Sequence, residues 1–147
     1  MDNLHYISSE ILNLETLQEI ISQDKKLALS DESIESIEKC RLYLDTKMAS
    51  QKTPIYGINT GFGSLCNVII SNDNLSKLQE NLVKSHACGT GEEVPHDIVK
   101  IMLLLKIQSL SYGNSGVQLI TVQRLVDFYN LQYGLAPAAS YCSFAIF

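Results

Sequence analysis

The sequence predicts a mostly helical fold. Apolar residues recur at helical spacing along most of the chain, capping residues or a proline precede these periodic stretches, and the glycines gather in two loops and one break. The 147 residues are enough for a real core, because a domain of this size buries roughly two thirds of its unfolded surface. We therefore expect one compact helical domain rather than two independent ones.

Two helices and a short extended stretch are predicted in the N-terminal third. Asn13 can cap a helix that ends before Lys25 and has its apolar residues on one face, namely Leu14, Leu17, Ile20 and Ile21. Lys26 to Leu29 is expected to be extended. Ser30 then begins a second helix, with acidic residues beside the positive end of its dipole. Its apolar positions are Ile34, Ile37, Cys40, Leu44 and Met48.

A glycine-rich loop and a third helix are predicted in the middle of the chain. Thr53-Pro54 ends the helical pattern, and Ile55 to Leu65 has neither helical nor strand periodicity. A helix from about Asn72 to Ala87 is then predicted by apolar residues at helical spacing, and glycines follow its end. These residues are Leu75, Leu78, Leu82 and Val83, followed by Gly89 and Gly91.

Two apolar helices are predicted toward the C-terminus. Pro95 suits the first turn of a helix in which Ile98 to Leu110 is apolar nearly all round, so we expect that helix in the middle of a bundle. Gly113 and Gly116 interrupt the pattern. The last helix, Val117 to Asn130, should bury one side, which carries Val122, Leu125, Val126 and Tyr129.

Composition and charge exclude several classes of function. With 46% hydrophobic and 18% charged residues, the chain fits a folded protein rather than a disordered one. A net charge of −5 with scattered Lys and Arg offers no surface for nucleic acid. No secretory signal or membrane span of ~20 apolar residues is present, which favours a cytoplasmic location. We expect reduced thiols and no metal site, because no close pair occurs among Cys40, Cys66, Cys88 and Cys142.

The loop Tyr56-Gly57-Ile58-Asn59-Thr60-Gly61-Phe62-Gly63 invites comparison with phosphate-binding loops. Glycines let backbone N–H groups approach an anion, but no Lys-Ser or Lys-Thr follows here and no apolar strand leads in. Taken alone, the string is typical of a mobile surface loop, with its tyrosine as a half-buried aromatic.

Three strings in order resemble the aromatic amino-acid ammonia-lyase family, and its histidine ammonia-lyase branch in particular. They are PIYGINTGFGSL at 54–65, LQENLVKSHACGTGEEVP at 78–95 and LLLKIQSLSYGNSGVQ at 103–118. The resemblance covers about residues 4–130 and implies the N-terminal helical domain of that fold, with the glycine-rich loop as a lid. It also implies elimination of ammonia from L-histidine to give trans-urocanate, as in histidine degradation, in a homotetramer whose site is assembled from several subunits.

The resemblance assigns roles to individual residues. Tyr56 is the implied base, although a tyrosine normally titrates near ~10 and needs surroundings that favour its phenolate. Gly57, Gly61 and Gly63 are the implied flexible positions of the lid. His86, after Ser85, is the implied contact to the substrate side chain, because one imidazole can hydrogen-bond another.

The sequence leaves alternatives open, both for the roles of its histidines and for the function of the chain. A lone histidine near a helix end is commonly structural, and His5 and His96 are expected to be solvated. Because similar Ser-His pairs occur in lyases that use tyrosine, a tyrosine ammonia-lyase is an alternative. A non-catalytic helical protein that binds a ligand or partner is another.

The cofactor implied by the family is methylidene-imidazolone, built from an internal Ala-Ser-Gly that this sequence lacks. Asn114-Ser115-Gly116 is not that tripeptide, because its first residue is Asn. We expect a lyase-like helical domain over residues 1–130 and a divergent tail over 131–147, explained by a truncation or frameshift after Asn130. The isolated chain is then expected to be inactive.

Overall fold

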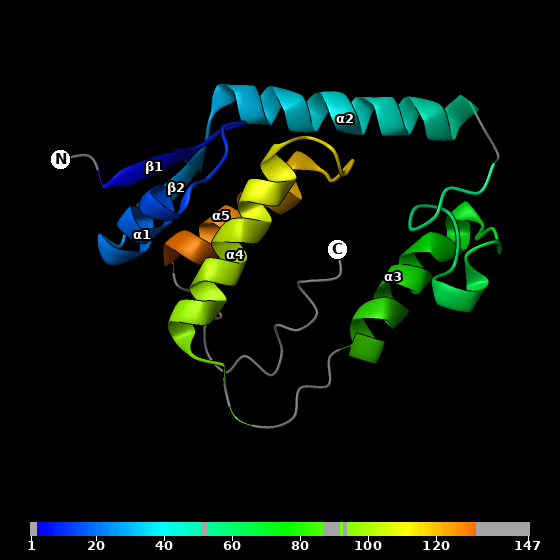
Figure 1. Ribbon diagram of the computed structural model, residues 1–147. Helices are drawn as coiled ribbons and strands as arrows, with labels where there is room; N and C mark the ends of the chain where they lie inside the picture. The colour runs from blue at the N-terminus through cyan, green and yellow to red at the C-terminus, as the bar shows by residue number, and fades with distance from the viewer. Residues whose placement is uncertain (1–2, 51–52, 87–91, 93, 132–147) are drawn as a thin grey trace. The chain divides into compact units, whose positions relative to one another are not determined.

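The computed structural model describes residues 3–50, 53–86, 92 and 94–131. The described residues form five α-helices, two β-strands and one short 3-10 helix, so the mostly helical fold is confirmed. They group into two compact units, which are described separately below (Figure 1). Among the described residues, the first unit contains 3–47 and 94–131, and the second contains 48–50, 53–86 and 92.

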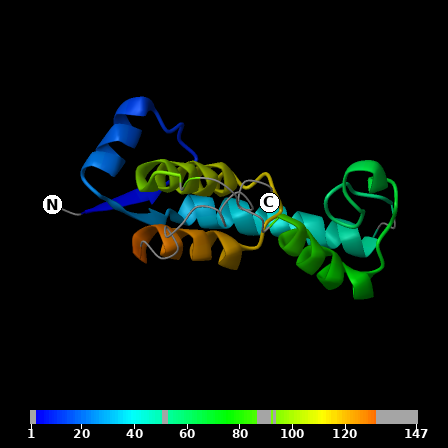
Figure 2. The ribbon, with the colours of Figure 1, turned by 90° about the horizontal axis from the view of Figure 1, so that it is seen from below.

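The first unit combines helices with a two-stranded parallel sheet. Its elements are β1 (Leu4–Ile7), α1 (Leu14–Ser22), β2 (Lys26–Leu29), α2 (Asp31–Ser50), α4 (His96–Ser111) and α5 (Leu119–Leu131). β1 pairs with β2 in the register Leu4 to Lys26 through Ile7 to Leu29. Figures 1 and 2 show α4 and α5 running side by side next to the strands. Chain segments distant in sequence therefore build one core.

The predicted helix starts are confirmed by hydrogen bonds. The Asn13 side chain accepts from the Thr16 amide at 2.8 Å and caps α1. The Ser30 hydroxyl accepts from the Ser33 amide at 3.2 Å, which satisfies one free N–H at the start of α2. β2 occupies the residues predicted to be extended. β1 was not predicted, because four residues carry too little periodicity to identify a strand whose partner lies beyond α1.

The core is built mainly from the strands, α4 and α5. Val122, Leu125, Val126 and Tyr129 are all buried, as the spacing of α5 predicted. They pack with residues of the other elements, including Ile7, Ile20, Leu27, Ile37, Leu104 and Ile107. The other face of α4 is not covered by the described residues, because Ile98, Met102 and Leu105 remain about half exposed.

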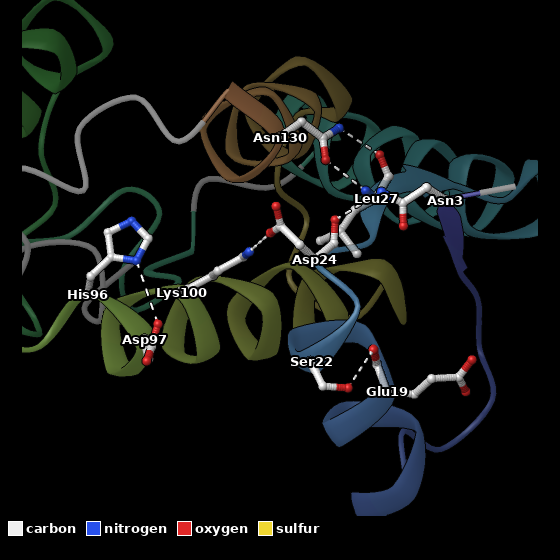
Figure 3. Close-up of polar contacts among 9 residues, drawn as sticks. All are labelled: Asn3, Glu19, Ser22, Asp24, Leu27, His96, Asp97, Lys100 and Asn130. Atoms are coloured by element: carbon white, nitrogen blue, oxygen red, sulfur yellow. Dashed lines mark hydrogen bonds and ion pairs between the residues drawn. The ribbon is translucent and has the colours of Figure 1, made fainter. Parts of the chain in front are cut away.

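Two polar contacts join α4 and α5 to the β2 region (Figure 3). The Asn130 side chain accepts from the Leu27 amide at 2.7 Å and donates to the Leu27 carbonyl at 2.8 Å. The buried Lys100 ammonium pairs with the Asp24 carboxylate just before β2. Because a buried charge without a partner is unstable, Asp24 compensates for the burial of Lys100.

The second unit contains the glycine-rich segment 53–70 and α3 (Asn72–His86). The predicted helix from about Asn72 to Ala87 is thus confirmed, while Gly89 and Gly91 lie outside the described residues. Within the segment, Gly63–Leu65 forms the 3-10 helix and Thr60 bridges Ile69 in antiparallel fashion. Figure 2 shows this segment at the N-terminal end of α3.

Candidate functional site

Asn59 organises the turn that carries Tyr56. Its side chain accepts from the Ile55 amide at 2.7 Å and donates to the Thr53 carbonyl at 3.1 Å, while Asn59 itself is only 6% exposed. Its carbonyl accepts from the Ile70 amide at 2.8 Å, on the returning strand of the segment. Asn59 therefore ties both sides of the glycine-rich segment together, and the segment is internally hydrogen-bonded rather than an open loop.

Tyr56 projects from this turn and is 63% exposed. Its ring meets the Phe62 ring edge to face, with centroids 6.2 Å apart. The phenol is thus in contact with Phe62 on one side and open to solvent on the other. Tyr129, in the first unit, is buried instead, and this burial raises its pKa to about 12. No charged residue occurs between positions 53 and 70.

The three glycines predicted from the sequence are required for different structural reasons. Gly57 and Gly63 have φ of +77° and +56°, a left-handed backbone conformation in which a side chain is strained. Space around both is open. Gly61 is tightly packed instead, since a Cβ there would lie 2.6 Å from the Leu65 Cβ. Backbone conformation thus explains two glycines and close packing explains the third.

Ser85 and His86 lie at the far end of α3 from the glycine-rich segment. Ser85 is exposed, and its hydroxyl donates to the Leu82 carbonyl at 2.9 Å. His86 is the last residue of α3, and its side chain lies outside what the structure describes. At about 1.5 Å per residue, α3 separates its two ends by roughly 20 Å. Tyr56 and the glycines share one hydrogen-bonded segment, and Ser85 lies in the last turn of the helix that follows it.

The structure also describes the surroundings of the other residues that the sequence analysis considered. Gly116, at the end of Asn114-Ser115-Gly116, accepts a hydrogen bond from Arg41 of α2 at 3.3 Å. His96 is exposed, as expected. His5 is not fully solvated as expected: it lies partly buried in β1, where burial and then the Lys25 charge lower its pKa. Cys40 and Cys66 are free thiols.

Asn59 and Phe62 were missed as candidates, although both lie inside the string around Tyr56. The signal for Asn59 was its residue type, since Asn side chains commonly close turns on nearby backbone groups. Phe62 gave no local signal, because its contact with Tyr56 depends on how the segment folds. Both support Tyr56 through positioning.

Two features are absent from the described part of the chain. No helix in it is long and apolar enough to cross a membrane. No group of three or more His, Cys, Asp or Glu side chains in it is placed to hold a metal ion.

Comparison with known proteins places the chain in a family. The model of the aromatic amino acid lyase family matches residues 12–138. The chain belongs to this family. It is 44% identical over 119 residues to a histidine ammonia-lyase of Legionella pneumophila, covering 81% of this chain and 23% of that protein. A histidine ammonia-lyase of Streptococcus pyogenes is 40% identical over 124 residues, covering 84% of this chain and 24% of the relative. The chain thus spans about a quarter of the length of these curated relatives.

Solved structures agree on the fold. A tyrosine aminomutase with bound ligand matches with a TM-score of 0.81 at 25% identity, over 95% of this chain and 28% of the other. The histidine ammonia-lyase of Trypanosoma cruzi matches with a TM-score of 0.74 at 31% identity, over 86% and 25%. The described helices therefore have the aromatic lyase fold, which is shared by proteins named for different reactions.

Proposed function

We propose that this chain supplies part of the active site of a histidine ammonia-lyase, which converts L-histidine to trans-urocanate and ammonia. The observation that carries the proposal is the exposed Tyr56 on an Asn59-closed turn, in a chain 44% identical to a histidine ammonia-lyase. An exposed phenol on an organised turn is suited to contact a substrate.

Tyr56 acts in this proposal as the general base. The proton to be removed is on the carbon beta to the amine and is weakly acidic, so the phenolate oxygen of Tyr56 must be held against that carbon. Phe62 limits the swing of the ring, and Asn59 fixes the turn beneath it. Segment 53–70 has no charged residue, so any charged group that acts on Tyr56 in this proposal lies outside the segment.

Ser85 and His86 contact the substrate side chain in this proposal. An imidazole at position 86 can exchange a hydrogen bond with the substrate imidazole. Ser85 and His86 end α3, and Tyr56 lies in the segment that precedes this helix. The family resemblance implies a homotetramer whose site is assembled from several subunits, and we propose that these residues enter such a site.

The glycine-rich segment is the proposed lid. Its internal hydrogen bonds would let it move as one piece, with Gly57 and Gly63 at the positions where the backbone already turns left-handed. Closing it would bring Tyr56 to the substrate and exclude water.

The electrophile of the family, methylidene-imidazolone, would make the amine a better leaving group. These 147 residues contain no Ala-Ser-Gly from which to build it. They do not fit that group, so we derive no step through it and assign this chain only proton acceptance and substrate contact. The proposed organisation keeps residues 1–130 as the lyase-like domain, and the tail over 131–147 lies outside the described residues apart from Leu131.

A tyrosine ammonia-lyase is the second candidate, favoured by the TM-score of 0.81 to a tyrosine aminomutase. The sequence identity is only 25% in that comparison, against 40–44% to the curated histidine enzymes. A non-catalytic binding protein is the third, and L-histidine binding without turnover in the chimera described next would favour it.

The test is a chimera in which residues 12–130 replace the matching segment of the Legionella pneumophila histidine ammonia-lyase. We expect urocanate from L-histidine, followed by ultraviolet absorbance, and little product from L-tyrosine. Tyr56→Phe should lower kcat about 10²- to 10⁴-fold, as loss of a general base does. The control is Tyr43→Phe on α2, since Tyr43 is 65% exposed and outside the segment. Equal effects of the two changes would contradict the role of Tyr56, and a preference for L-tyrosine would favour the second candidate.

The isolated chain provides a complementary test. Without an Ala-Ser-Gly it should form no urocanate from L-histidine. Turnover by the purified chain alone would mean that this chemistry does not need the group.

A further inference from the structure

Asn59 holds the residue before Tyr56 through both of its backbone polar groups. The Asn59 side-chain oxygen accepts from the Ile55 backbone amide at 2.7 Å, and the Asn59 backbone amide donates to the Ile55 carbonyl at 3.2 Å. The Ile58 amide donates to the same carbonyl at 3.1 Å. The peptide unit that leads into Tyr56 is therefore fixed by hydrogen bonds from the far side of the turn.

The Asn59 side chain uses a donor and an acceptor at once. While its oxygen accepts from Ile55, its amino group donates to the Thr53 carbonyl at 3.1 Å, and the residue is 6% exposed. An ionised Asp at this position has the acceptor but not the donor, and Ala has neither. Because water has little access to this residue, a substitution would leave the backbone groups of Thr53 and Ile55 with poor partners.

The backbone of Asn59 joins the turn to the rest of the segment. Its carbonyl accepts from the Ile70 amide at 2.8 Å, and the Gly61 amide donates to the Val68 carbonyl at 3.1 Å. α3 begins two residues after Ile70. Residue 59 therefore links the turn that carries Tyr56 to the stretch of chain that leads into α3.

The Tyr56 ring depends on this backbone for its position. The ring contacts Phe62, but the residue is 63% exposed, so side-chain packing covers only part of it. The next residue, Gly57, has a φ of +77° and open space around it, and it has no side chain to restrain the turn. The hydrogen bonds of Asn59 thus provide a restraint that side-chain packing does not.

We propose that Asn59 is a positioning residue. Its side-chain amide holds the turn so that the Tyr56 oxygen stands where it can accept the proton from the carbon beta to the substrate amine. This role rests on the proposed function of Tyr56 as the general base. A displacement of about 1 Å in a reacting group can slow a reaction about 10²-fold, so loss of both side-chain hydrogen bonds should lower kcat by about that factor. KM should change little, because the substrate contacts themselves remain.

The test compares Asn59→Ala in two backgrounds of the chimera described above, one with Tyr56 and one with Tyr56→Phe. With Tyr56 present, Asn59→Ala should lower kcat about 10²-fold. With Tyr56→Phe, the same change should lower kcat less than about twofold, because a residue that acts through the tyrosine then has nothing left to position. A purely structural role of Asn59 would instead lower kcat by the same factor in both backgrounds.

Two further variants support the comparison. Asn59→Ser keeps a hydroxyl that is too short to reach both partners, so its kcat should fall by less than that of Asn59→Ala. If Asn59→Ala does not fold, as judged by circular dichroism, Asn59→Ser gives the same comparison in the two backgrounds. Asn74→Ala is the matched control, since Asn74 is an exposed residue of α3 whose side chain donates to the Ser71 hydroxyl at 3.0 Å. It should leave kcat within about twofold of the unchanged chimera.

The outcomes separate this role from the proposed function. If Tyr56→Phe lowers kcat but Asn59→Ala acts no more strongly than Asn74→Ala, or acts equally in both backgrounds, the positioning role is overturned and Tyr56 remains the base. A rise in KM with unchanged kcat would assign Asn59 to substrate binding, which also overturns it. If Tyr56→Phe leaves kcat unchanged, the proposed function itself fails and the role of Asn59 fails with it.

Discussion

The contact between Asn130 and Leu27 gives a quantitative prediction for the stability of the first unit. Leu27 is 2% exposed, and its amide and carbonyl on the outer edge of β2 both bond to the Asn130 side chain, at 2.7 and 2.8 Å. Asn130→Ala removes both partners at once. A buried backbone group left unsatisfied costs about 1–3 kcal/mol, and partial access of water reduces the sum for two such groups to about 2–4 kcal/mol.

Thermal unfolding followed by circular dichroism measures this loss. For a chain of this size, about 2–4 kcal/mol corresponds to a fall in Tm of roughly 10 °C. Asn130→Asp should be at least as destabilising as Asn130→Ala, because a carboxylate oxygen replaces the amide donor opposite the Leu27 carbonyl. The control is Gln123→Ala, an exposed position on the same helix. If Asn130→Ala lowered Tm no more than Gln123→Ala, the two hydrogen bonds would not stabilise the edge of β2 as argued.

Three further predictions concern packing and pH. Gly113→Ala should lower the free energy of unfolding by more than about 2 kcal/mol in urea denaturation, because φ is +68° and a Cβ would lie 2.5 Å from the Ser36 carbonyl oxygen; an effect below about 1 kcal/mol would show that the turn relaxes. The Lys100 ammonium, by its hydrogen bond and its charge, holds the pKa of Asp24 below its ordinary 3.8, so this stabilisation is present above that pH and is lost as pH falls through the lower folded value. Asp24→Asn should therefore lower Tm at neutral pH but much less in acid, and a pH-independent difference would contradict the pairing. Burial lowers the pKa of His5 below 6.5, so Tm should fall as pH drops from 6.5 toward the folded value, and His5→Gln should reduce that slope.

Most helices could be predicted from local sequence because their signals are local. Asn13 and Ser30 cap backbone amides three residues ahead, and the buried positions of α5 follow helical spacing. β1 could not be predicted in this way, since its hydrogen bonds go to β2 across an intervening helix.

Some residues of the candidate site could likewise be identified from the sequence, and others only from the structure. Tyr56 and its glycines could be identified because the string around them resembles a family. Asn59 and Phe62 could not, because their roles depend on contacts that form only when segment 53–70 folds back on itself. The position of Ser85 relative to Tyr56 likewise depends on the length and direction of α3.

The sequence by itself determined the helical class, most helix boundaries and membership of the aromatic amino acid lyase family, because periodicity, caps and ordered motifs are properties of neighbouring residues. Only the tertiary structure decided which polar groups meet. Asp24 and Lys100 are 76 residues apart in sequence, and Leu27 and Asn130 are 103 apart. It also decided that one apolar face of α4 is covered and the other exposed, since burial depends on which surfaces the rest of the fold brings against a helix.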